Sequence, residues 1–145
     1  MSIQAQCEAE VTDLLRFFEQ WYAGELPDTN EVFARFEIVL APSFHIITPD
    51  ARVIDRQSIL ALVRGAHPSA AEAGQAGGSK YAVRNYRHRL TIDRIALVTY
   101  EEWQTHGAET RPRLSTALLQ AKPDTPHGVE WLHVHETWMP NPEAV

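Results

Sequence analysis

The residues best suited to chemistry gather in the last regular stretch of the chain, WLHVHETWMP, which runs from Trp131 to Pro140. Side chains alternate along a strand, so one face of this stretch would carry Trp131, His133, His135 and Thr137, and the other Leu132, Val134, Glu136 and Trp138. Imidazoles titrate near neutral pH, and polar groups beside an indole are more typical of a cavity wall than of a dry core. The sequence therefore predicts that the face with the two imidazoles lines a cavity.

Two preceding strands add polar groups on the same predicted face. Tyr100 and Glu102 would come from one of them, and Arg113 and Ser115 from the other. A base, a carboxylate and a fixed cation in an apolar cup suit general acid–base work on a small hydrophobic molecule, such as enolisation, dehydration or epoxide opening. We predict His135 as the general base or ligand anchor, with Glu102 and Arg113 orienting a substrate oxygen. The predicted ligand-binding residues are Tyr22, Tyr100, Ser115, Trp131, His133 and Thr137.

Other interpretations of these residues remain open. His133 and His135 at this spacing could be two ligands of a zinc ion, with His45 or Glu102 as a third, but zinc sites need three or four converging ligands. We therefore assign no metal ligands and expect no cofactor. Glu102 and Arg113 could instead form a structural ion pair, with the histidines satisfied by hydrogen bonds. In an interaction module the cup would be plugged by Trp131, Tyr22 and their neighbours.

Composition limits the function classes. The chain has 145 residues, which we interpret as a single domain over 1–145. Its net charge of -6 makes nucleic acid and anionic membrane surfaces unlikely partners. The single cysteine, Cys7, excludes an internal disulfide. Residues 2–13 are polar rather than a secretory signal, and no apolar run approaches the roughly 18 residues of a membrane helix, so we expect a soluble, cytoplasmic protein.

Hydrophobic periodicity predicts helices at 4–23, from Asp28 to before Pro42, and from Asp55 through Val63. A short strand is expected at 44–48, followed by longer strands at 81–93, 94–106, 112–122 and 131–140. Residues 65–79 are rich in Gly, Ala and Ser and are interpreted as a connection rather than a lid. This order predicts an α+β fold, with three N-terminal helices packed on one face of a curved antiparallel sheet.

Three helices cannot cover both faces of such a sheet. The uncovered face is predicted to carry Leu97, Trp103, Leu114, Leu118, Val134 and Trp138. An apolar patch of this size usually meets a partner, so we expect a homodimer through the outer sheet face.

Several segments resemble the nuclear-transport-factor-2-like superfamily, whose cone-shaped, cystatin-like fold includes scytalone dehydratase, ketosteroid isomerase and the SnoaL-like polyketide cyclases. The matching segments are ALVTYEEW (96–103), RLSTALL (113–119), a turn ending in glycine, and then Trp131, 134–136 and Trp138. The chain looks like the uncharacterised bacterial SnoaL-like branch, and the association domain of calcium/calmodulin-dependent kinase carries a similar Trp-x-x-Val-His strand. Relatives often have His and Ser where this chain has Thr137 and Met139, and Asp-Gly where it has Asp50 and Ala51.

The Tyr and two Asp of ketosteroid isomerase, and the His pair and Tyr of scytalone dehydratase, have no matching positions in this chain, so no known catalytic set of the superfamily transfers to it. The superfamily includes enzymes, binding domains and assembly domains. The resemblance implies a protein that binds a small hydrophobic molecule in the cone cavity, as a cofactor-independent lyase, isomerase or hydrolase. The alternative is a non-catalytic module for homodimerisation or ligand sensing.

Overall fold

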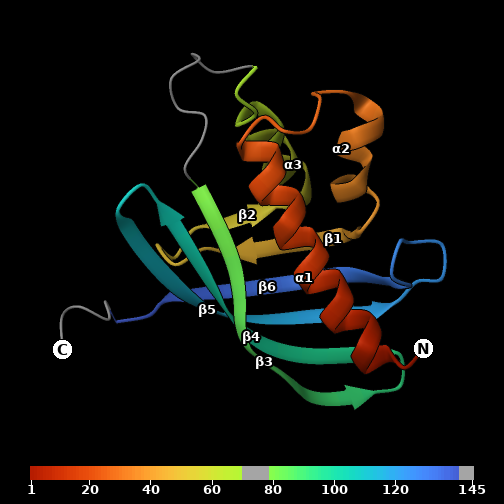
Figure 1. The fold of residues 1–145 in the computed structure, drawn as a ribbon. Coiled ribbons are helices and arrows are strands. Elements are labelled where there is room, and N and C mark those ends of the chain that lie inside the picture. The colour runs from red at the N-terminus through yellow and green to blue at the C-terminus, as the bar shows by residue number, and fades with distance from the viewer. Residues whose placement is uncertain (70–78, 141–145) are drawn as a thin grey trace.

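The computed structural model describes residues 1–69 and 79–140. Within these ranges three helices lie on one face of a curved, six-stranded sheet, which confirms the predicted α+β architecture (Figure 1). The strand order is β2-β1-β6-β5-β4-β3. All neighbouring strands are antiparallel except β1 and β6, which run parallel. The sheet is therefore mixed, whereas the sequence predicted a purely antiparallel one. In the described part of the chain, no helix is long and apolar enough to cross a membrane.

The helices follow the predicted apolar stripes. Helix α1 spans Ile3–Tyr22, crosses the face of the sheet beside β3 and buries Val11, Leu14 and Trp21 (Figure 1). Helix α2 spans Asn30–Glu37, and α3 spans Arg56–Gly65. Asp55 caps α3 by accepting a hydrogen bond from the Ser58 amide at 2.8 Å, as its position before the helix predicts.

Helix α2 differs from its prediction at both ends. Its N-cap is Thr29, whose hydroxyl accepts from the Val32 amide, whereas the predicted cap, Asp28, binds Arg64 at 2.7 Å. The helix ends at Glu37 because strand β1 already begins at Leu40. Burial of 39–41 against the end of the sheet outweighs the helical periodicity that these residues share with α2.

The sheet is built from β1 (Leu40–Ile47), β2 (Val53–Asp55), β3 (Ser79–Ile92), β4 (Ile95–His106), β5 (Glu109–Ala121) and β6 (Val129–Trp138). The four long strands predicted from the sequence are all present, and β1 is longer than the predicted 44–48. Most of the predicted connection at 65–79 lies outside the described residues.

A bulge in β6 decides which side chains face the helices. Leu119 of β5 pairs with Trp131, and the adjacent Leu118 pairs with His133, so Leu132 is an extra residue. One extra residue reverses the alternation from that point on. Trp131 therefore shares the concave face with Val134 and Glu136, while His133, His135 and Thr137 take the outer face. The prediction that Trp131 and the histidines share one face is wrong for this reason.

Contacts from distant segments hold Trp131 at the bulge. Its amide donates to the Val39 carbonyl at 2.6 Å, and its indole Nε1 donates to Glu10 Oε2 at 2.9 Å. Glu10 is fully buried, and its carboxylate accepts hydrogen bonds from both terminal nitrogens of Arg35, at 2.8 and 3.2 Å. Burial raises the pKa of Glu10, whereas the Arg35 charge and the indole hydrogen bond favour its ionised form. This network fixes one wall of the space between α1 and the sheet.

Candidate active site

A cavity of about 440 Å³ lies between the concave face of the sheet and the helices. Most of its wall is apolar and aromatic, with Phe18, Tyr22, Phe36, Phe44, Tyr100 and Trp131 among the lining residues. Thr48 and His106 also line it. An apolar cavity of this size that also contains converging polar groups has the general properties of a small-molecule site.

The polar groups of the cavity come from three adjacent strands. Glu102 of β4, Arg113 of β5 and Glu136 of β6 all line it. Arg113 Nε lies 3.4 Å from Glu102 Oε2, and its Nη1 donates to Glu136 Oε1 at 3.1 Å. Gln104 Nε2 also donates to Glu102 Oε2, at 2.9 Å. One guanidinium thus lies between two carboxyl groups that are only 7% and 8% exposed.

Burial and mutual repulsion make these carboxyl groups hold a proton unusually well. Desolvation, followed by the charge of Glu136, raises the pKa of Glu102 from 4.5 to about 7, against the opposing effects of Arg113 and Gln104. Burial likewise raises the pKa of Glu136, although Arg113 favours its ionised form. Because the two groups interact strongly, the pair titrates as a unit. Near neutral pH it can both give and accept a proton.

Tyrosines surround this pair as neutral hydrogen-bonding groups. Burial raises the pKa values of Tyr22, Tyr81 and Tyr100, so these phenols keep their protons at physiological pH. Ser115 is fully buried and pairs in register with Tyr100 on one side and Glu136 on the other. Its hydroxyl is buried and has no hydrogen-bond partner among the described residues.

The structure brings five of the predicted site residues to the cavity, namely Tyr22, Tyr100, Glu102, Arg113 and Trp131. Ser115 lies on the same face, behind the lining. These positions agree with the alternation predicted for β4 and β5, which contain no bulge between the paired residues.

The two predicted site histidines, His133 and His135, lie on the opposite side of the sheet from the cavity. His135 and Thr137 are exposed on the outer face, which removes the geometric basis for His135 as a base acting in the cavity. The His133 ring lies beside the His45 ring, with centroids 4.8 Å apart and the planes tilted by 56°, and its Nδ1 lies 2.9 Å from the His45 carbonyl oxygen. Glu102, one of the two possible third ligands in the zinc hypothesis, faces the cavity on the other side of the sheet and cannot join the two histidines. The described residues hold no group of three or more His, Cys, Asp or Glu that could bind a metal ion.

Sequence reasoning missed Glu136 and Val134, which the assumed alternation placed on the outer face. The sequence did contain a signal for this, because the residues that alternate with Glu136 along the strand are apolar. Val134 and Trp138 flank Glu136 at two-residue spacing, whereas the row of His133, His135 and Thr137 is polar throughout. A row with large apolar side chains on both sides of a carboxylate is the better candidate for the buried face.

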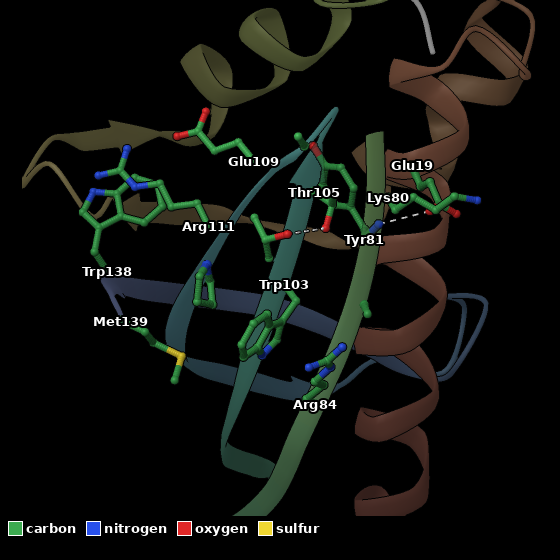
Figure 2. Close-up of a pocket in the computed structure, with 14 residues that line it drawn as sticks. Glu19, Lys80, Tyr81, Arg84, Trp103, Thr105, Glu109, Arg111, Trp138 and Met139 are labelled. Carbon is green, nitrogen blue, oxygen red and sulfur yellow. Dashed lines mark hydrogen bonds between the residues drawn. The ribbon is translucent and has the colours of Figure 1, made fainter. Parts of the chain in front are cut away.

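A second, larger concavity of about 1030 Å³ lies at the ends of β3, β4 and β5. Figure 2 shows Trp103 beside Arg84, whose guanidinium carbon lies 4.4 Å from the ring centroid. Arg111 stacks in the same way on Trp138, at 3.5 Å. These cation–π pairs give the groove rigid walls, but its lysine and arginine side chains are exposed and their charges are screened by water. The inner cavity, with its buried acid pair, is the stronger candidate.

Known proteins resemble this chain in sequence and in fold. Residues 7–140 match the family model described as sucrose-6-phosphate phosphohydrolase C-terminal. Sucrose-phosphatase 2 and sucrose-phosphatase 1 of Nicotiana tabacum are 26% and 25% identical over 140 residues. The match covers 90% of this chain but only 30% of either relative.

Solved structures share the whole fold. A nuclear-transport-factor-2-like protein of unknown function from Pseudomonas aeruginosa is 20% identical and superposes with a TM-score of 0.79, over 93% of this chain and 99% of that one. A hub homology domain of calcium/calmodulin-dependent kinase II from Chlamydomonas reinhardtii gives a TM-score of 0.68 at 18% identity, over 96% and 100% of the two chains. These likenesses establish the nuclear-transport-factor-2-like fold, and the match over residues 7–140 shows that the chain belongs to the sucrose-6-phosphate phosphohydrolase C-terminal family.

Proposed function

We propose that this domain binds a small, largely apolar molecule in the inner cavity, with Glu102, Arg113 and Glu136 as the groups that anchor it and exchange protons with it. The observation that carries the proposal is a buried pair of carboxyl groups, 3.4 and 3.1 Å from one guanidinium, that opens onto an aromatic cavity. Burial also raises the pKa of Glu102 to about 7. A proton donor or acceptor works best when its pKa lies near the operating pH.

The acid pair supports a cofactor-independent isomerase, lyase or hydrolase. Ionised Glu102 would take a proton from the substrate, and the resulting carboxylic acid would return it at another atom or to a departing hydroxyl group. Arg113 would stabilise negative charge that develops on a substrate oxygen. In this scheme Glu102 takes the role of general base that the sequence had suggested for His135.

The charge at the polar end of the cavity, where Glu102, Arg113 and Glu136 lie, disfavours a phosphate ester as the bound molecule. Among the described residues that line it, two carboxyl groups flank the single guanidinium. A phosphate dianion would meet net repulsion there. We therefore do not expect this cavity to bind a sugar phosphate, although the similar proteins from Nicotiana tabacum are sucrose-phosphatases.

Binding of 2-naphthol, followed by its own fluorescence, tests the proposal. A two-ring alcohol is small enough for a cavity of about 440 Å³. Val134→Phe would fill space inside the cavity and should weaken binding at least tenfold, whereas Leu118→Phe adds the same ring on the outer face and should leave binding unchanged. Equal binding by both variants would place the ligand elsewhere and contradict the proposal. Circular dichroism would confirm that each variant is folded.

The outer sheet face favours a second function, assembly into a homodimer. On this face, Leu97 of β4 pairs in register with Leu90 of β3 and with Leu118 of β5. Leu90 is 45% exposed, and Leu114, four residues before Leu118 on β5, is 43% exposed. Val134, which the sequence had placed on this face, lies on the concave face instead. Trp138 lies at the C-terminal end of β6, with the guanidinium groups of Arg111 and Arg113 over its ring.

Light scattering coupled to size-exclusion chromatography tests this assembly. We expect a dimer that Leu114→Glu converts to monomer, because a charge in an apolar contact is not compensated. Leu62→Glu is the matched control, since Leu62 is 52% exposed on helix α3, away from the outer face. A monomeric parent protein, or a Leu114→Glu variant that stays dimeric, would contradict the proposed interface.

A further inference from the structure

We infer that the ligand of the inner cavity carries a single protonated amine on a compact apolar body. This inference rests on the proposed function, because it concerns the same cavity and the same polar groups. It follows from the number and arrangement of the charges at the polar end, from the aromatic walls beside them, and from the hydrogen bonds of Glu102.

Among the described residues that line the polar end, one guanidinium faces two carboxyl groups. Arg113 lies between Glu102 and Glu136, at 3.4 and 3.1 Å, so one guanidinium serves two carboxyl groups. A buried carboxylate without a cation is strongly disfavoured. Without a ligand, the pair can meet this requirement by retaining a proton. A ligand cation would replace that proton and leave both carboxylates ionised and paired.

The side chain of Gln104 favours the ionised form of Glu102. It donates an amide hydrogen to Glu102 Oε2 at 2.9 Å and lowers the pKa that burial raises. If Glu102 stayed protonated to donate a hydrogen bond to a neutral ligand, a hydrogen-bond acceptor in the place of the Gln104 amide would stabilise that protonated form. The amide donor stabilises the ionised form instead. The groups that face the acid pair include Tyr22 from α1, Tyr81 from β3 and His106 at the cavity lining. Both tyrosines are neutral at physiological pH, so they contribute no cation.

The cavity walls suit the same class of ligand. Tyr22, Phe36, Tyr100 and Trp131 line it, and the electron-rich face of an aromatic ring attracts an ammonium group. Hydrogen bonds between ammonium and carboxylate are roughly twice as strong as those between neutral partners. A carboxylate or phosphate ligand would add a further negative charge to a site already rich in them. The order of affinity we expect is therefore amine, then alcohol, then acid.

Binding of an amine should depend on pH in a way that binding of an alcohol does not. An amine needs ionised Glu102, whose pKa is about 7, so its affinity should rise about tenfold between pH 6 and pH 8. The affinity should level off above pH 8, where Glu102 is almost fully ionised, and should fall near pH 10, where the amine itself loses its proton. A neutral ligand of the same shape displaces no proton, and its affinity should change little over this range.

Isothermal titration calorimetry with three ligands of one shape tests the inference. The probes are cyclohexylmethylamine, cyclohexylmethanol and cyclohexanecarboxylate, each at pH 6, 7 and 8. We expect the amine to bind at least tenfold more tightly than the alcohol at pH 8, with release of a proton at pH 6. Glu102→Gln should bring amine affinity to the level of the alcohol. Glu109→Gln, an exposed change at the start of β5, should not.

The outcomes separate this inference from the proposed function. Equal affinity for amine and alcohol, or amine binding that does not vary with pH, would overturn the inferred ligand class while leaving the cavity as a binding site. Failure of all three probes would also overturn the inference. If 2-naphthol failed as well, the proposed function itself would be wrong.

Discussion

Removing the charge of Glu102 should stabilise the protein, and the gain should appear only as the pH rises. The pKa of Glu102 is raised from 4.5 to about 7 by burial and by Glu136. Between these values the folded protein holds a proton that the unfolded chain has released, so the parent protein loses stability as the pH rises through this window. Glu102→Gln has no such group, so its advantage grows over the same range and is complete above pH 7.

The magnitude follows from the width of that window. Each pH unit between the folded and unfolded pKa values contributes about 1.4 kcal/mol, so the change from pH 5 to pH 8 amounts to about 2.5 kcal/mol. Gln is close to Glu in size and keeps a hydrogen-bonding partner for Gln104. The free energy of unfolding of Glu102→Gln, relative to the parent, should therefore increase by about 2–3 kcal/mol between pH 5 and pH 8.

Urea denaturation at several pH values, followed by tryptophan fluorescence, measures this difference. Titrating groups that behave alike in both proteins cancel in the comparison. Glu109→Gln serves as the matched control, because Glu109 is exposed and its substitution should give a difference that does not vary with pH. A Glu102→Gln variant that is less stable than the parent at pH 8, or whose stability difference is constant with pH, would refute the argument that Glu102 is a buried acid with a raised pKa.

Three further predictions concern the framework around the cavity. Arg35→Leu should destabilise the fold by about 3–5 kcal/mol in urea denaturation, because it leaves the fully buried Glu10 without its cation; a loss below 1 kcal/mol would mean that Glu10 is protonated. Gly128→Ala should cost about 1 kcal/mol or more, since φ is +76° and a Cβ would lie 2.5 Å from Gln6 Nε2; adding Gln6→Ala should recover only the part due to that contact. Burial lowers the pKa of His133 in the folded protein, so the unfolded chain binds a proton more readily and the protein should lose stability as the pH falls below 6.5. An NMR titration of the His133 ring that gave a pKa above 6.5 would contradict this.

Local patterns in the sequence were sufficient for most of the architecture. The apolar stripe of α1 and the Asp55 cap of α3 depend on residues close together in the chain, and both are present as predicted. Strict alternation along β4 and β5 likewise placed Tyr100, Glu102 and Arg113 on one face, because neither strand is interrupted where they pair. Periodicity of side chains is a local property and can be read from a single sequence.

The membership of the site was decided only by the tertiary structure. The bulge at Leu132 moves His133 and His135 to the outer face and brings Glu136 into the cavity, and Leu132 itself gives no local signal for it, such as a glycine. The contacts that hold Trp131 at the bulge come from Val39 and Glu10, which are distant in sequence. The raised pKa of Glu102 depends on burial and on Glu136, two strands away in the sheet. Sequence alone therefore determined the three helices and the four long strands, whereas long-range packing determined where β1 begins, whether β2 forms, and which titratable groups meet in the cavity.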